Sequence, residues 1–197
     1  MRLSPDFPQI LSWSENLADI VVQSGFEPDL IIGLANKGLV PGKIIADRFA
    51  VPIYPLKISR TSHALIVNES DVAQKYRAAP EAPANLNFAL NESMRVLVVD
   101  ESINTGASVI AAAKLLTSFG ASAQLLKVAA LADVQTPRIA DFFLMETDAK
   151  WFGGHFCSAK VDSDYVAWMD VHFPAISVTL KKKFGQPTEP NSRLKPA

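Results

Sequence analysis

The sequence predicts an α/β fold, a doubly wound parallel sheet flanked by helices with a small C-terminal hood. Short apolar runs rich in β-branched residues suit strands that are buried on both faces of a parallel sheet. These runs alternate with segments of helical periodicity between Pro28 and Leu131, as in sheets built from βαβ units. A polar, glycine-containing loop follows the run Val96–Val99, at the strand end where such sheets bind ligands.

The expected elements follow the chain in order. Ser12–Glu15 has the form of a capping box, which predicts a helix over 14–24. We expect strands at 30–34, 51–59, 96–99 and 123–131, and helices at 39–49 and over 109–119. Pro55 places the second strand near an edge or bulge, and 166–173 is a candidate hood strand. Periodicity fades from 60 to 92, which predicts a long loop.

Composition narrows the class of protein. The 197 residues fit one domain, which we expect over 1–184 with its hood mainly at 141–180, followed by a proline-containing loose tail at 185–197. A net charge of −1 gives no support to nucleic-acid binding. The single cysteine, Cys157, excludes an internal disulfide and favours a reducing compartment. No signal peptide or membrane-length span is evident, so we expect a cytoplasmic protein without membrane association.

The stretch from Val96 to Phe119 carries the chemistry. Asp100 and Glu101 end the apolar run, and the small-residue loop 102–108 leads into a helix. A helix N-terminus offers N–H groups to a phosphate, and Gly106 lets the backbone come close to it. The two carboxylates can accept hydrogen bonds from sugar hydroxyls or hold Mg²⁺ through its waters. The pattern favours a sugar-phosphate site; an ordinary βα turn with acids on its solvated rim is the alternative.

The motif Asp-Glu-Ser-Ile-Asn-Thr-Gly-Ala-Ser resembles the phosphoribosyl pyrophosphate (PRPP) signature of type I phosphoribosyltransferases, and implies their fold. By this resemblance Asp100 and Glu101 bind the ribose hydroxyls and, indirectly, the metal. The loop that cradles the 5′-phosphate would consist of Ser102, Ile103, Asn104, Thr105, Gly106, Ala107 and Ser108.

The segment Ala35-Asn36-Lys37-Gly38 precedes Leu39-Val40-Pro41 and is similar to the pyrophosphate loop of xanthine/guanine-type members. It departs from their pattern, because Asn36 stands where they have Arg and Lys37 where they have Gly. The resemblance implies that Ala35, Asn36, Lys37 and Gly38 bind pyrophosphate. Lys37 is expected to reach it, with a solvated loop lysine as the alternative.

The resemblance also suggests a base-binding hood and a lid. Trp151, and then Phe152, would stack on the nucleobase, although a core tryptophan fits the pattern equally well. A flexible loop over 60–92 would close over the substrates, with Lys75-Tyr76-Arg77 as its candidate charges, although a solvated basic turn fits these residues equally well.

The implied function is nucleotide salvage, by transfer of a phosphoribosyl group from PRPP to a nucleobase or related nitrogenous base with release of pyrophosphate. The implied cofactor is Mg²⁺, and the implied assembly is a homodimer. The catalytic residues would be Asp100, Glu101, Asn104 and Lys37. The altered turn favours an alternative, a non-catalytic PRPP- or nucleotide-binding regulator; a different sugar-phosphate enzyme is a third possibility. Members that act on 6-oxopurines typically have Asp where this chain has Asn104, which predicts poor activity on those bases.

Overall fold

The computed structural model describes residues 5–60, 76–78, 90–134, 137–146 and 163–184. These fall into two compact units, Leu11–Lys150 and a smaller unit made of Met1–Ile10 with Trp151–Ala197. Within the described ranges, no helix has both the length and the apolar character needed to cross a membrane.

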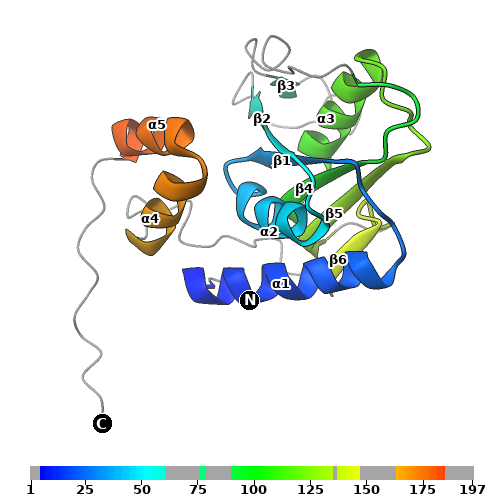
Figure 1. Cartoon of the computed structure of the whole chain (residues 1–197). Coiled ribbons are helices and arrows are strands. Elements are labelled where there is room, and N and C mark those ends of the chain that lie inside the picture. Colours follow the sequence, from blue (N-terminus) through cyan, green and yellow to red (C-terminus); the bar gives the residue numbers. More distant parts are fainter. Residues whose placement is uncertain (1–4, 61–75, 79–89, 135–136, 147–162, 185–197) are drawn as a thin grey trace. The chain divides into compact units, whose positions relative to one another are not determined.

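The larger unit is built on a six-stranded sheet in the order β3-β2-β1-β4-β5-β6 (Figure 1). The pairs β2–β1, β1–β4, β4–β5 and β5–β6 are parallel, and β3 pairs antiparallel with the end of β2. The strands are β1 (Leu30–Ala35), β2 (Ile53–Arg60), β3 (Tyr76–Ala78), β4 (Val96–Ile103), β5 (Leu126–Asp133) and β6 (Phe142–Glu146). The prediction of a parallel α/β sheet is confirmed.

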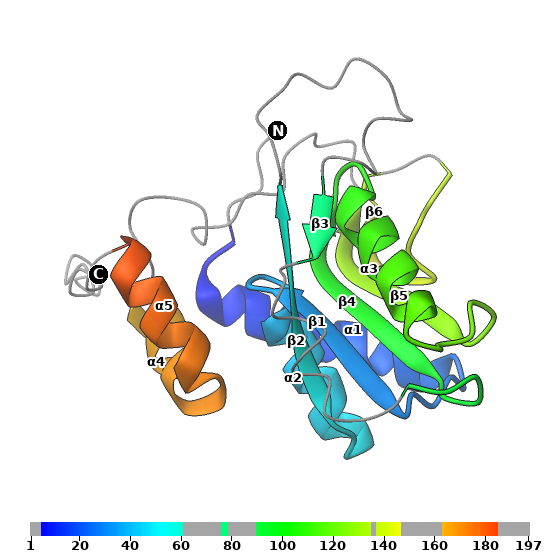
Figure 2. The ribbon, with the colours of Figure 1, turned by 90° about the horizontal axis from the view of Figure 1, so that it is seen from above.

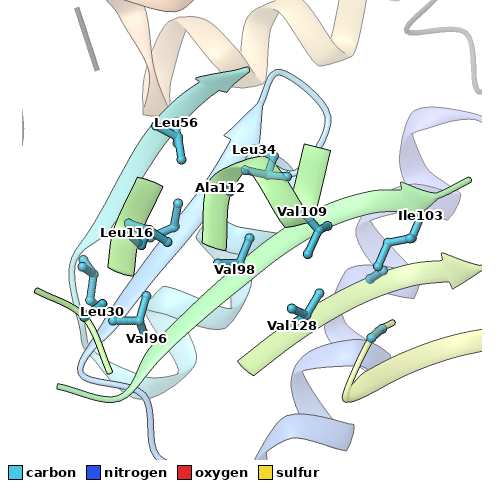
Figure 3. Packing of buried hydrophobic residues seen from close by; sticks show 14 of the residues in the cluster. Leu30, Leu34, Leu56, Val96, Val98, Ile103, Val109, Ala112, Leu116 and Val128 are labelled. Atoms are coloured by element: carbon cyan, nitrogen blue, oxygen red, sulfur yellow. The ribbon is translucent and has the colours of Figure 1, made fainter. Parts of the chain in front are cut away.

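Helices cover both faces of this sheet, as Figures 1 and 2 show. Helix α2 (Leu39–Phe49) packs on the face of Ile31, where Gly33 lets Leu39 approach the strand. Helix α3 (Ala107–Ser118) packs on the opposite face. The apolar core cluster on this face takes every second residue of β1 and of the start of β4, because successive side chains of a strand point to opposite faces of the sheet (Figure 3). Labelled members are Leu30, Leu34, Leu56, Val96, Val98, Ile103, Val109, Ala112, Leu116 and Val128.

The strand order creates a switch point between β1 and β4. From β1 the chain adds β2 on one side of the sheet, and later adds β4, β5 and β6 on the other side. The connections that leave β1 and β4 therefore diverge and leave a crevice at the carboxyl ends of these two strands. Open α/β sheets bind their ligands in such a crevice.

Helix α1 (Phe7–Gln23) begins well before the predicted start, so the capping-box prediction was wrong. Asp6 caps the helix instead, because its Oδ1 accepts a hydrogen bond of 2.9 Å from the Gln9 N–H. Ser12 and Glu15 lie inside the helix, where Glu15 forms an ion pair with Arg48 of α2.

The predictions for the segments of β2, β3 and β4 had different outcomes. Strand β2 lies next to the edge strand β3, which pairs only with residues 58–60 and not with Pro55, so the prediction that Pro55 places its strand near an edge is confirmed. The strand β3 falls inside the stretch expected to be a loop. Strand β4 continues through Asp100 and Glu101 to Ile103, beyond the predicted end at Val99.

The smaller unit contains two helices that the sequence did not predict. Residues 166–173, a candidate strand, fall largely in helix α4 (Ser163–His172), and α5 (Pro174–Phe184) lies at the end of the expected hood and domain, just before the expected tail. Lys181 of α5 pairs with Asp170 of α4 at 2.6 Å. The Trp168 ring contacts Phe7, His172 and Phe173, so aromatic packing at helical spacing explains why this segment is not a strand.

Candidate functional site

Two adjoining pockets lie at the carboxyl ends of β1 and β4. The first has a volume of about 130 Å³ and follows the loop after β4. The second, of about 220 Å³, also reaches the turn after β1. Both are bounded by Asp100, Ser102, Asn104 and Ser108, so the pockets form one continuous polar crevice at the switch point.

The first pocket is lined by all seven residues of the predicted phosphate loop. These are Ser102, Ile103, Asn104, Thr105, Gly106, Ala107 and Ser108. Gly106 has a φ of 72°, in the left-handed region that favours glycine, and a Cβ there would overlap Ile139 Cδ1. The loop conformation therefore depends on a residue without a side chain at this position.

Helix α3 starts directly from this loop. Gly106 is its N-cap and provides no side-chain cap for the first helical turn. The Thr105 Oγ1 accepts a long hydrogen bond of 3.5 Å from the Ala107 N–H. The positive end of the helix dipole thus faces the first pocket, where it favours a bound anion.

The second pocket is bounded on one side by the turn after β1. Ala35, Asn36 and Lys37 line it, and the Ala35–Asn36 peptide bond is cis. Gly38 does not line the pocket but lies directly on β4, because a Cβ there would overlap the Val99 carbonyl oxygen. The structure thus brings three of the four predicted pyrophosphate-binding residues beside the phosphate loop.

The two neighbouring acids have different surroundings because side chains alternate across a strand. Asp100 lines both pockets. The Glu101 side chain is 1% exposed and does not line either pocket; its Oε2 lies 3.0 Å from Lys37 Nζ. Apart from this ion pair, neither Glu101 carboxylate oxygen has a hydrogen-bond donor among the described residues.

Burial raises the pKa of both carboxyl groups. The pKa of Asp100 rises to about 7, mainly through desolvation, and the negative charge of Glu101 adds to the increase. Asp100 Oδ1 accepts a hydrogen bond from the Glu101 N–H at 2.8 Å, and this bond opposes the rise. Burial also raises the pKa of Glu101, and Lys37 opposes that change.

Asp133 lines neither pocket but supports the loop beside the first one, which the sequence pattern did not reveal. It is fully buried, and its Oδ2 accepts hydrogen bonds of 2.8 Å from the N–H groups of Ile139 and Ala140. These bonds fix the backbone of Ile139, whose side chain lies against Gly106 of the phosphate loop. The only sign of this role in the sequence is that Asp133 ends an apolar run shortly before Pro137.

Several predicted residues lie outside the described part of the chain. Trp151 and Phe152 are among them, as are Lys75 and nearly all of the predicted 60–92 lid. Their assignment to base binding and closure remains a prediction.

The residues of the crevice could hold Mg²⁺ only if a substrate supplied further ligands to the ion. Asp100 is the one carboxylate among the described lining residues, and no cluster of three His, Cys, Asp or Glu side chains occurs within the described ranges. Mg²⁺ commonly uses one or two carboxylates with waters and substrate phosphates. A metal here would therefore arrive with a phosphorylated substrate.

Comparison with known families decides the classification. The sequence model of the phosphoribosyl transferase domain matches residues 6–159. The chain belongs to the phosphoribosyltransferase family. The resemblance drawn from the 100–108 motif is confirmed, whereas a search of curated proteins gave no match to this member of the family.

Solved structures share the fold of this phosphoribosyltransferase-family chain. A purine phosphoribosyltransferase from Pyrococcus horikoshii Ot3 has a TM-score of 0.60 at 20% identity, over 82% of this chain and 97% of the other. A Neisseria gonorrhoeae protein with bound ppGpp has a TM-score of 0.62 at 15% identity, over 84% and 93%. Helicobacter pylori xanthine-guanine-hypoxanthine phosphoribosyltransferase has a TM-score of 0.57 at 17% identity, over 79% and 93%.

Proposed function

We propose that this protein is a Mg²⁺-dependent phosphoribosyltransferase that transfers the phosphoribosyl group of PRPP to a nucleobase or related nitrogenous base, in nucleotide salvage. The observation that supports this most is the continuous crevice between the 102–108 loop and the 35–37 turn. PRPP carries a 5′-phosphate and a diphosphate on opposite sides of its ribose. Two polar pockets that share Asp100 match this arrangement of charges.

The 5′-phosphate would occupy the first pocket. The α3 N-terminus and the Thr105 and Ser108 hydroxyls offer donors there, and Gly106 leaves room for the ligand to reach the backbone. The ribose hydroxyls would then lie beside Asp100, which is the acid that faces the crevice. Glu101, also predicted to bind ribose, would need to leave its ion pair with Lys37 to do so.

The diphosphate would occupy the second pocket beside the 35–37 turn. Asp100 would hold Mg²⁺ there, directly or through water, together with oxygens of PRPP. When bound, the metal would neutralise charge that develops on the leaving diphosphate. The site thus supplies orientation and electrostatic stabilisation, which can account for much of the acceleration of such a reaction.

The reaction exchanges one bond at the ribose anomeric carbon for another. The bond from this carbon to the diphosphate oxygen breaks, and the leaving group keeps the electron pair. The ring then has oxocarbenium character until a base nitrogen lone pair forms the new bond. Asn104, which lines both pockets, can hydrogen-bond to the acceptor but cannot take up its proton.

The direct test is pyrophosphate release on mixing the protein, PRPP, Mg²⁺ and a panel of bases. We expect release with at least one base, and strong loss of PRPP binding in Asp100→Asn. No release with any base, despite PRPP binding, would reject the transferase. We also propose a cytoplasmic homodimer, and light scattering coupled to gel filtration measures the oligomer.

A non-catalytic regulator that binds PRPP or a nucleotide is the second candidate. The altered turn at 35–38 favours it, because Asn36 stands where xanthine/guanine-type members of the family have Arg, and Lys37 where they have Gly. The Neisseria relative with bound ppGpp makes that nucleotide a sensible ligand to include in the panel. Binding of PRPP or ppGpp without pyrophosphate release would favour the regulator.

A further inference from the structure

We propose that Lys37 is a positioning residue: its ammonium is the counter-ion of Glu101 and holds the pyrophosphate turn on β4, so the diphosphate itself is bound by the turn and by Mg²⁺. The inference rests on the proposed function for the identity of the ligand. It replaces the predicted role of Lys37 as a direct ligand of pyrophosphate.

The first argument is the burial of Glu101. Its side chain is 1% exposed, and Lys37 Nζ lies 3.0 Å from its Oε2. No hydrogen-bond donor among the described residues reaches its carboxylate beyond this ion pair. A buried charge whose partner is removed is strongly destabilising, so this acid needs the cation in place.

The second argument is the attachment of the turn to β4 at two successive residues. Lys37 reaches the strand through its side chain, at Glu101. Gly38 reaches it through its backbone, so closely that a Cβ would overlap the Val99 carbonyl oxygen. Together these contacts fix the backbone of the turn that lines the second pocket.

The third argument concerns the cost of the alternative role. If the ammonium moved to a bound diphosphate, the Glu101 charge would remain in a site closed to water. Asp100, directly before it in β4, would add like-charge repulsion. Keeping the ion pair avoids both penalties. It also leaves Asn36, the exposed residue of the turn, as a residue that lines the second pocket and is open to an incoming ligand.

The test is a mutant cycle with inorganic pyrophosphate and Mg²⁺ as the probe. Pyrophosphate has no ribose, so any contact of Glu101 with sugar hydroxyls does not enter the result. The variants are Lys37→Met, Glu101→Met and the double variant, with Lys37→Arg to retain the charge. Lys43→Met is the matched control, since Lys43 has a similar side-chain exposure (24% against 26%) but pairs with an Asp47 that is 62% exposed.

We expect Lys37→Met to lower the melting temperature and to weaken pyrophosphate binding at least tenfold. Lys37→Arg and Lys43→Met should remain close to the wild type. The double variant removes both charges, so it should recover the melting temperature and bring the pyrophosphate affinity within about threefold of the wild type. This recovery is the decisive result, because a direct ligand cannot be replaced by removing a second residue.

Two outcomes overturn the inference. If the folded double variant binds pyrophosphate as weakly as Lys37→Met, Lys37 contacts the diphosphate itself. If the melting temperatures of the single variants simply add in the double variant, Lys37 does not hold the turn through Glu101. A wild type that binds neither pyrophosphate nor PRPP rejects the proposed function, while the melting temperatures still decide the role of Lys37.

Discussion

Asp100 and Glu101 are adjacent in the chain but differ in environment. The sequence predicted a buried strand that ends at Val99, with both acids directly after it. It did not predict that the strand continues to Ile103, and this continuation directs Asp100 toward the crevice and Glu101 into the protein. The buried ion pair also depends on the conformation of a turn more than sixty residues away, which no local pattern encodes.

Asp100 should make stability depend on pH. Its pKa of about 7 in the folded protein exceeds that of an aspartate in an unfolded chain, so unfolding between about pH 4 and 7 releases a proton. This contribution to stability is complete below about pH 4 and is lost as the pH rises through 7. Asp100→Asn should therefore be more stable than the wild type at pH 8, by roughly 1–3 kcal/mol, and similar to it at pH 4.

Thermal unfolding of both ligand-free proteins across this pH range measures the difference. Comparing the two cancels the contributions of the other carboxylates. A constant difference between the two proteins at all pH values would contradict the assigned protonation of Asp100.

Gly106→Ala should impair the phosphate loop for a steric reason. A side chain at this left-handed φ is strained, and the new Cβ would overlap Cδ1 of Ile139, so the end of that side chain must move away from the loop. Gly25→Ala is the matched control, because its φ of 74° is similar and a Cβ there meets nothing within 4 Å. The control should cost about 1 kcal/mol of backbone strain, and Gly106→Ala measurably more.

Calorimetric titration with ribose 5-phosphate adds the functional readout. Binding should be retained in Gly25→Ala and fall at least tenfold in Gly106→Ala. Equal affinity in the two variants would place the phosphate elsewhere.

At the scale of elements, the sequence predicted segments with a clear apolar pattern better than the exact start of a helix or a segment with an ambiguous pattern. Strand β1 and helix α2 agree with their predictions almost residue for residue, because apolar burial determines both. The start of α1 was misplaced, since one exposed side chain, Asp6, sets it. In α4, the apolar residues of 166–173 were consistent with either period, and aromatic contacts selected the helix.

The start of α1 can be tested with two alanine substitutions. Asp6→Ala removes the acceptor for the Gln9 N–H, so it should destabilise the protein by about 0.5–2 kcal/mol. Ser12→Ala removes the residue that the sequence pattern suggested as the cap. It should change stability by less than about 0.5 kcal/mol, because Ser12 is exposed in the helix interior.

Urea unfolding of the two variants gives both values. A larger loss in Ser12→Ala than in Asp6→Ala would mean that the helix begins near residue 13, as the capping-box pattern indicated.

At the scale of the whole molecule, the alternation of strands and helices was sufficient to predict the sheet and the edge that carries the crevice. Because β1 and β4 are neighbours, two motifs far apart in sequence meet at the switch point. The sequence predicted one domain over 1–184 and gave no sign of the two compact units into which the chain divides. Contacts among Phe7, Tyr165 and Trp168, which join the two ends of the chain in the smaller unit, have no signature in local periodicity.

The choice of acceptor is a property of the complete site, and we expect this protein to be a poor catalyst with hypoxanthine or guanine. By resemblance, members that act on 6-oxopurines use an Asp at the position of Asn104 and a Lys shortly after the strand that the sequence predicts at 123–131. Asn104 faces the crevice but cannot accept the proton of the base. At the end of β5 stands Asp133, whose carboxylate is buried and bonded to the backbone of Ile139 and Ala140. A site without these partners loses the selectivity that they confer, while transfer to other bases is still possible.

Steady-state assays with hypoxanthine, xanthine, guanine, adenine, orotate and uracil measure the preference. Asn104→Asp is the informative variant, and we expect it to improve the rate with 6-oxopurines. A wild-type kcat/KM above about 10⁴ M⁻¹s⁻¹ for hypoxanthine or guanine, the lower end of ordinary enzyme efficiency, would contradict this expectation.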